Sequence, residues 1–313
     1  MEYLRLVAGF ILLLYGGHLL VKGGVALADR FKLSPLVIGL TVVSFGTSAP
    51  ELFVSVVAGI RGHDQVAIGN VIGSNIANVA LVLALTAIIF PIPVRSTSVK
   101  IDGPFMLVMS LLLLGFLYNL VLSRWEGLVF IVLITAYTYW HFHYSRKKKD
   151  FDDKQVKVKQ MKLWKIILLL ILSYLGLAFG SELLVNNASK IAIDLGVDER
   201  IIAVTMVAFG TSLPELVTSV IAAFKKEMDI SIGNIIGSNI FNILVVLGIS
   251  SLIKPLKVNP AFISSDIFWM LGTSFLLFVF ILPFKGGKLT RIKGAILFLI
   301  YCVYIYILYF SRA

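Results

Sequence analysis

Long apolar runs separated by short polar breaks extend along almost the whole chain. A helix that crosses a bilayer needs ~20 mostly apolar residues, and the runs are long enough for about ten such helices. The approximate ranges of the predicted helices are 4–27, 35–60, 66–89, 104–122, 126–144, 165–190, 200–224, 230–252, 263–283 and 290–310. The pattern therefore predicts an all-α integral membrane protein with ten transmembrane helices.

The second half of the chain repeats the first half at a spacing of 164 residues. Between residues 35–85 and 199–249, 24 of 51 positions are identical, and the spacing has drifted to 167 by Gly127 and Gly294. Each half holds five predicted helices. Because five is an odd number, the second half must enter the membrane in the opposite orientation, which gives two inverted five-helix repeats. The predicted parts are a first repeat at 1–144, a basic cytoplasmic linker at 145–164 and a second repeat at 165–313.

Composition and charge agree with a membrane protein. The chain is 58% hydrophobic and 14% charged, whereas a soluble protein is nearer half apolar and a quarter charged. The net charge of +11 lies in loops and above all in the linker, so it does not indicate a nucleic-acid partner. If the linker is cytoplasmic, the loops on its side carry 19 Lys and Arg and the other side carries eight. We therefore expect a multi-pass cell-membrane protein, in contact with the lipid bilayer, with both termini outside the cytoplasm.

Each repeat contains one stretch in which polar residues interrupt an apolar helix. The first copy reads S-F-G-T-S-A-P-E-L over Ser44–Leu52 and G-N-V-I-G-S-N-I-A-N over Gly69–Asn78. The second copy reads A-F-G-T-S-L-P-E-L over Ala208–Leu216 and G-N-I-I-G-S-N-I-F-N over Gly233–Asn242. Each copy places a glutamate, Glu51 or Glu215, inside a segment that is otherwise suited to lipid.

A charged group at the centre of a bilayer costs at least ~2.5–3.5 kcal/mol, so it should face a partner or a polar cavity. The facing segments 66–89 and 230–252 hold no Lys or Arg. The counter-charge for Glu51 and Glu215 should then come from ions in solution. A protonated glutamate that bonds two helices together is the alternative, but its recurrence in both repeats favours an ion site.

The residues around the two glutamates suit a hard cation. Pro50 and Pro214 cannot donate to the carbonyls of Gly46 and Gly210, which frees carbonyls around 44–47 and 208–211 to line a cavity. Thr47 and Ser48 share a helix face with Glu51, and Thr211 and Ser212 share one with Glu215. In the helix that follows each motif, a serine and an asparagine stand four residues apart, Ser74 with Asn78 and Ser238 with Asn242. If the four helices meet at the repeat interface, these oxygens converge with the two carboxylates.

These ligands indicate which cations could bind. Ca²⁺ takes six to eight oxygens, largely carboxylate and carbonyl groups. Zinc and copper prefer His or Cys, and the four histidines and the single cysteine lie away from the motif. Two carboxylates can be neutralised by one Ca²⁺, by several Na⁺ or by protons, which makes counter-transport natural. No nucleotide-binding signature is present, so an ion gradient should supply the energy. We expect neither an enzyme nor a resident cofactor.

The paired motifs resemble the two alpha-repeats of the sodium/calcium exchangers in the cation/calcium exchanger superfamily. The resemblance implies a secondary active antiporter that exchanges Ca²⁺ for Na⁺ by alternating access at a mid-membrane site. It implies that Glu51 and Glu215 bind Ca²⁺ with the backbone carbonyls of Thr47 and Thr211. It further implies that the first and sixth helices slide across the other eight. The residues implied in Na⁺ binding are Ser44, Ser48, Ser74, Ala208, Ser212 and Ser238.

Two departures within the superfamily narrow this expectation. Asn242 occupies a position that is Asp in some potassium-dependent relatives, so K⁺ co-transport is not expected. The proton/calcium branch has G-N-A-x-E where this chain has G-T-S-x-P-E, which favours Na⁺ over H⁺. An H⁺/Ca²⁺ antiporter, a cation channel and an intramembrane enzyme remain as alternatives. One chain is sufficient for the site, and the sequence leaves the oligomeric state open.

Overall fold

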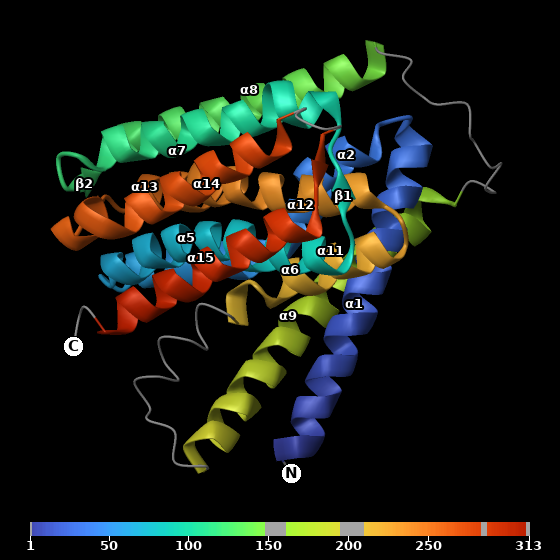
Figure 1. Ribbon diagram of the computed structural model, residues 1–313, viewed down its shortest axis with the longest axis horizontal. Helices are drawn as coiled ribbons and strands as arrows, with labels where there is room; N and C mark the ends of the chain where they lie inside the picture. Colours follow the sequence, from blue (N-terminus) through green and yellow to red (C-terminus); the bar gives the residue numbers. More distant parts are fainter. Residues whose placement is uncertain (1, 148–160, 195–209, 283–286, 311–313) are drawn as a thin grey trace. The chain divides into compact units, whose positions relative to one another are not determined.

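The computed structural model describes residues 2–147, 161–194, 210–282 and 287–310 (Figure 1). Almost all of these residues are helical. Among them, seven helices are long and apolar enough to cross a membrane, or eight if the bent pair Pro35–Thr47 and Ala49–Ile60 counts as one span. The predicted all-α membrane fold is confirmed. The count of ten crossings stays a prediction, and residues 200–209 of the seventh predicted helix lie outside the described residues.

The chain forms two compact units, and each unit draws on both repeats. Unit 1 comprises residues 1–47 and 135–234, and unit 2 comprises residues 48–134 and 235–313. The boundaries fall inside the two polar motifs, between Thr47 and Ser48 and between Asn234 and Ile235. The division at 144 and 165 follows the duplication of the sequence, and it stays a prediction.

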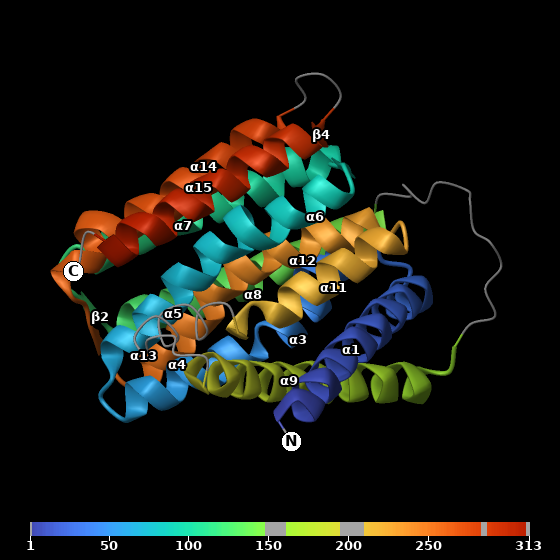
Figure 2. The ribbon, with the colours of Figure 1, turned by 60° about the horizontal axis from the view of Figure 1, so that its bottom comes forward.

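Unit 1 is built around an antiparallel pair of long helices, α1 (Glu2–Phe31) and α9 (Leu163–Asp194), which lie side by side in Figures 1 and 2. Small residues let the two backbones approach. A Cβ atom at Gly16 would lie 2.9 Å from the backbone nitrogen of Leu177, and one at Gly180 would lie 2.8 Å from that of Leu13. The shorter elements of unit 1 are α2 (Pro35–Ile38), the π-helix η1 (Gly39–Val43), α3 (Ser44–Thr47) and α11 (Leu213–Phe224).

The core of unit 1 is apolar and joins these elements. Leu13 and Leu20 of α1 and Leu177 of α9 pack with residues of η1 and α11. One apolar face of α1 and of α9 is therefore buried against the shorter helices. Other apolar side chains of these two helices, such as Phe10 and Phe179, remain exposed, as in a lipid-facing helix.

Unit 2 holds the remaining helices, and its elements repeat in register. The π-helix η2 (Asn78–Leu83) matches η4 (Asn242–Leu247), and η3 (Ser98–Asp102) matches η5 (Phe262–Asp266), each at a spacing of 164 residues. Single π-turns inside α-helices are rare and occur often at functional sites. The other elements of unit 2 are α4 (Ala49–Ile60), α5 (Asp64–Ala77), α6 (Ala84–Ile89), α7 (Gly103–Leu117), α13 (Gly248–Ile253), α14 (Ile267–Ile281) and α15 (Arg291–Phe310). Two helices, α8 (Arg124–Lys147) and α12 (Met228–Phe241), run from one unit into the other.

Two short strand pairs show the two-fold relation between the repeats. β1 (Ile92–Pro93) pairs antiparallel with β4 (Lys288–Leu289), and β2 (Val121–Leu122) pairs antiparallel with β3 (Leu256–Lys257). Each pair joins one repeat to the other, and the duplication exchanges the two pairs. Figure 2 shows β2 and β4 at opposite ends of the unit 2 helices. The two pairs therefore lie at opposite ends, as inverted repeats require.

Candidate cation site

The proline of each motif breaks the helix at the same point. The sequence predicted a helix over 35–60 that is broken at Pro50, and the structure ends α3 at Thr47, begins α4 at Ala49 and bends the chain by 48°. Ser48 (φ −89°, ψ 8°) and Ser212 (φ −87°, ψ 1°) have the same backbone conformation. This bridge region is sparsely populated and is common in active sites. The cause is that Pro50 and Pro214 have no N–H and crowd the preceding turn.

Glu51 and Glu215 each lie in the first turn of the helix that follows the break. Both side chains are fully buried. The preceding segment ends in carbonyl groups, and at this kind of broken helix such carbonyls bind cations.

In unit 1, Asn234 links the first repeat to the helix that carries Glu215. The Thr47 hydroxyl donates to Asn234 Oδ1 at 3.0 Å, and Asn234 Nδ2 donates to Ser219 Oγ at 3.0 Å. Ser219 lies one turn after Glu215 on α11. The hydrogen-bonded chain therefore fixes the end of α3, with its carbonyls, against the helix of the glutamate from the other repeat.

In unit 2, Asn70 makes the corresponding bond. Asn70 Nδ2 donates to Ser55 Oγ at 2.9 Å and lies 3.2 Å from the backbone carbonyl oxygen of Glu51. Ser55 Oγ donates in turn to the carbonyl of Ala67 at 3.4 Å. The bond from Asn70 to Ser55 is the counterpart, 164 residues earlier, of the bond from Asn234 to Ser219. Each glutamate helix is thus held by an asparagine at the same place.

Asn70 and Asn234 belong to the candidate site through these bonds, and they are not among the residues predicted from the sequence. They stand in the quoted motifs directly after Gly69 and Gly233, and Asn70 lies four residues before Ser74. Residues four apart share a helix face, so this spacing was the signal that could have identified them.

Unit 2 also contains a cluster of four buried asparagines, two at the end of α5 and the start of η2 and two at the end of α12 and the start of η4. Asn75 Nδ2 donates to the carbonyl of Asn239 at 3.2 Å, and Asn239 Nδ2 donates to the carbonyl of Asn75 at 3.3 Å. Asn78 Nδ2 donates to Asn239 Oδ1, and Asn242 Nδ2 donates to Asn75 Oδ1, both at 3.1 Å. The cluster maps onto itself when the repeats are exchanged, so the two-fold relation passes through it.

The predicted site residues fall into the two units as follows. Unit 1 holds Ser44, Thr47, Thr211, Ser212 and Glu215, and unit 2 holds Ser48, Glu51, Ser74, Asn78, Ser238 and Asn242, while Ala208 lies outside the described residues. Among the described residues, the buried hydroxyls of Ser74 and Ser212 and the Oδ1 atoms of Asn78 and Asn242 have no hydrogen-bond partner. The meeting of Glu51 and Glu215 in one site stays a prediction.

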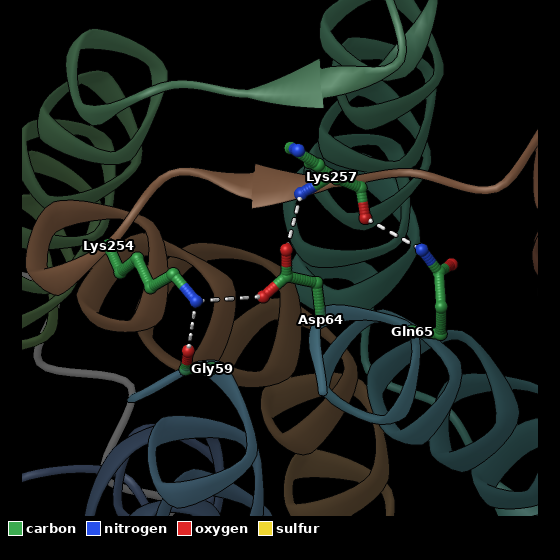
Figure 3. Close-up of polar contacts among 5 residues, drawn as sticks. All are labelled: Gly59, Asp64, Gln65, Lys254 and Lys257. Atoms are coloured by element: carbon green, nitrogen blue, oxygen red, sulfur yellow. Dashed lines mark hydrogen bonds and ion pairs between the residues drawn. The ribbon is translucent and has the colours of Figure 1, made fainter. Parts of the chain in front are cut away.

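The loop after α4 is tied to strand β3 by a charged network (Figure 3). Lys254 Nζ lies 3.7 Å from Asp64 Oδ1 and donates to the carbonyl of Gly59 at 3.1 Å. Asp64 Oδ2 accepts from the backbone N–H of Lys257 at 3.1 Å, and Gln65 Nε2 donates to the Lys257 carbonyl at 3.1 Å. The network fixes the end of the helix that bears Glu51.

The corresponding loop after α11 has different chemistry. Burial raises the pKa of Glu227, and Asp229 and Asp29 raise it further, while Lys225 opposes them. Burial also lowers the pKa of Lys225, whose Nζ donates to the carbonyl of His18 at 3.2 Å. This loop in unit 1 therefore combines partly buried charges, where the loop in unit 2 has one bonded acid.

Comparison with known proteins extends over the whole chain. The profile of the family described as sodium/calcium exchanger protein matches residues 1–142 and 165–310. The sodium/calcium exchanger MaX1 of Methanosarcina acetivorans is 32% identical over 99% of both chains. The inner membrane protein YrbG of Escherichia coli is 34% identical over 86% of this chain and 85% of its own.

A solved structure is similar throughout. The sodium-calcium exchanger NCX_Mj, soaked with zero Na⁺ and Ca²⁺, superposes with a TM-score of 0.83 at 32% sequence identity. The match covers 98% of each chain. Further structures of NCX_Mj, soaked with Na⁺ together with Ca²⁺ or Sr²⁺, are similar to the same degree.

Proposed function

The chain belongs to the sodium/calcium exchanger protein family and is a multi-pass membrane antiporter of Ca²⁺ and another cation, and we propose that the other cation is Na⁺. It is a transporter rather than an enzyme, and the ions are its substrates rather than cofactors. We further propose that it works in the cell membrane, with both termini outside the cytoplasm.

The observation that carries the proposal is the repetition of one local structure around two glutamates. In both repeats a proline breaks the helix, and a fully buried glutamate occupies the first turn after the break. In both repeats an asparagine bonds to the serine one turn further along. An isolated structural glutamate has no reason to recur with its surroundings intact. Two carboxylates give a charge that one Ca²⁺ balances.

Na⁺ and Ca²⁺ can share such a site because both bind oxygen. Ca²⁺ would use Glu51, Glu215 and the carbonyls of Thr47 and Thr211. Na⁺ ions would use the neighbouring hydroxyls and carbonyls at positions 44, 48, 74, 208, 212 and 238. Two carboxylates at membrane depth are costly without positive charge, so Na⁺, or protons in the alternative mechanism, would take the place of Ca²⁺ as it leaves. Such replacement favours exchange over one-way passage.

Alternating access requires one part of the protein to move relative to another. The pair formed by α1 and α9 is suited to this role because its interface is built on Gly16 and Gly180 and both helices expose apolar side chains. We propose that these two helices move together as one body. The similarity to NCX_Mj, a protein that shows extracellular ion exchange and induced occlusion of its binding site, supports this mechanism.

Vesicle flux tests the proposal. Purified protein in proteoliposomes loaded with Na⁺ should take up ⁴⁵Ca²⁺ when diluted into Na⁺-free buffer, and it should not do so when loaded with K⁺ or choline. A protonophore should leave the uptake intact. Uptake that follows a pH gradient and ignores Na⁺ would instead establish the H⁺/Ca²⁺ antiporter. Ca²⁺ conductance without any counter-ion would establish a channel.

A further inference from the structure

We propose that Asn75 and Asn239 are positioning residues that fix the orientation of the amides of Asn78 and Asn242, so that the Oδ1 oxygens of the latter pair are presented to transported cations. This inference rests on the proposed site, because Asn78 and Asn242 are its predicted amide ligands. Asn75 and Asn239 themselves are not proposed to contact the ion.

The orientation of Asn75 is fixed by backbone. Its Nδ2 lies 3.2 Å from the carbonyl oxygen of Asn239, which can only accept a hydrogen bond. Its second N–H is directed at the sulfur of Met270, 3.7 Å away, which is also an acceptor. Turning the amide over would place Oδ1 against two acceptors. Asn239 is fixed in the same way by the carbonyl of Asn75 and the sulfur of Met106.

The fixed amides then orient their neighbours. Asn75 Oδ1 can only accept, so Asn242 must direct its Nδ2 toward it, at 3.1 Å. In the same way, Asn239 Oδ1 can only accept, so Asn78 must direct its Nδ2 toward it. The oxygens of Asn78 and Asn242 are therefore the atoms that remain, and both are buried without a hydrogen-bond partner among the described residues. A buried amide oxygen without a donor is costly, and a bound cation would satisfy it.

The difference between oxygen and nitrogen decides whether the side chain can bind a cation. An Asn that presented its NH₂ group would direct partial positive charge at the ion. In water or in an unconstrained pocket both orientations are accessible, so an Asn ligand without an orienting partner would be a poor one. The cluster removes this freedom at both positions, and it does so before any ion arrives.

The test uses the fact that a carboxylate has no wrong orientation. Four proteins are compared: wild type, Asn75→Leu, Asn242→Asp, and the double variant. Apparent affinities for Ca²⁺ and Na⁺ are obtained from the rise in unfolding temperature with ion concentration, because a ligand stabilises the folded state in proportion to its binding. We expect Asn75→Leu alone to weaken cation binding by roughly tenfold or more. In the Asn242→Asp background the same substitution should not weaken cation binding, because a carboxylate presents an oxygen in either orientation and leucine removes the Asn75 Oδ1 acceptor that would face it.

The repeat supplies matched controls. Asn239→Leu combined with Asn78→Asp should behave as the first cycle does, because it is the two-fold counterpart. The crossed combination, Asn75→Leu with Asn78→Asp, leaves Asn242 without its orienting partner, so the tenfold loss should persist. If Asn75→Leu does not fold, Asn75→Ser replaces it, since serine is too short to receive the Asn242 amide.

Two results would overturn the inference. Equal losses from Asn75→Leu in both backgrounds would mean that Asn75 acts on packing alone. A lower unfolding temperature with unchanged cation affinity would mean the same. Failure of the proposed function gives a different result, namely wild-type proteoliposomes that show no Na⁺-dependent Ca²⁺ uptake. The affinity cycle is still readable in that case, with whichever cation stabilises the wild-type protein.

Discussion

The helices that carry the two glutamates have nearly the same sequence motif, but they belong to different units. Glu51 lies in unit 2 with Ser55 and Asn70, all from the first repeat. Glu215 lies in unit 1, where Asn234 joins its helix to Thr47 of the other repeat. Duplication has therefore kept the same local chemistry around each glutamate while placing the two copies in different units. What differs is the partner, because Asn70 bonds the helix of Glu51 within its own repeat, whereas Asn234 bonds the helix of Glu215 to the other repeat.

The largest expected effect concerns the glutamates themselves. Glu51→Gln and Glu215→Gln should each abolish Na⁺-dependent Ca²⁺ uptake, a loss of at least about 100-fold, because either change leaves Ca²⁺ with only one carboxylate in a medium where charge is costly. Uptake by proteoliposomes is the measurement. Glu182→Gln, at an exposed position of α9, is the matched control and should transport normally. Normal exchange in either variant would show that the substituted glutamate is not part of the Ca²⁺ site.

The two asparagines that hold the glutamate helices should differ in importance. Asn234→Leu removes the bond that the Thr47 hydroxyl donates to Asn234 and the bond that Ser219 accepts from it, and so releases one repeat from the other. Each buried group left unsatisfied costs about 1–3 kcal/mol, so we expect a 10- to 100-fold loss of Ca²⁺ affinity. Asn70→Leu breaks bonds within a single repeat and should cost less. Titration of Ca²⁺ against unfolding temperature measures both, and equal losses would contradict the difference between the units.

The glycines that precede the two breaks offer a third comparison. A methyl group at Gly46 would overlap the ring of Tyr174, whose hydroxyl donates to the carbonyl of Val42 at 3.0 Å. A methyl group at Gly210 would come 2.6 Å from Cγ2 of Val185, a smaller side chain. Overpacking costs about 1–3 kcal/mol, and we expect Gly46→Ala near the upper end and Gly210→Ala near the lower. Thermal unfolding in detergent measures the difference, and a larger loss for Gly210→Ala would contradict the packing.

Substitutions in the charged network beside α4 should have a still smaller effect on stability. Asp64→Ala removes the acceptor of the Lys257 N–H, which should lower the free energy of unfolding by about 1–2 kcal/mol. Lys254→Gln should cost less than about 1 kcal/mol, because the lysine side chain is 42% exposed and exposed ion pairs contribute little. High salt should weaken the effect of Lys254→Gln and leave that of Asp64→Ala in place.

The smallest effect is expected at the loop of unit 1. Because the pKa of Glu227 is raised in the folded protein, the folded state holds its proton more firmly than the unfolded state does. Stability is therefore lost as the pH rises from the ordinary glutamate pKa through the raised one. Glu227→Gln should raise the unfolding temperature slightly at pH 8 and leave it unchanged below the ordinary pKa. An unfolding temperature that falls at pH 8 would show that the carboxylate stabilises the loop.

Several features could be read from the sequence because they are local. The apolar runs required membrane helices, since about 20 such residues have no other stable environment. The duplication, with an odd number of helices predicted in each half, predicted inverted repeats. Pro50 and Pro214 required a break before each glutamate, because a residue without an N–H cannot continue the helix ladder. The candidate oxygens followed from the residue types beside those breaks.

Other features depended on contacts between segments that lie far apart along the chain. The bond from Thr47 to Asn234 joins residues from different repeats, and the four asparagines of the cluster come from α5 with η2 and from α12 with η4. No periodicity in one helix reveals which helix it crosses, or which way an amide is turned. The division of the motifs between two units is of the same kind, because it is decided by packing between whole helices. The sequence thus determined what chemistry each helix carries, and only the tertiary structure decided which groups hold that chemistry in place.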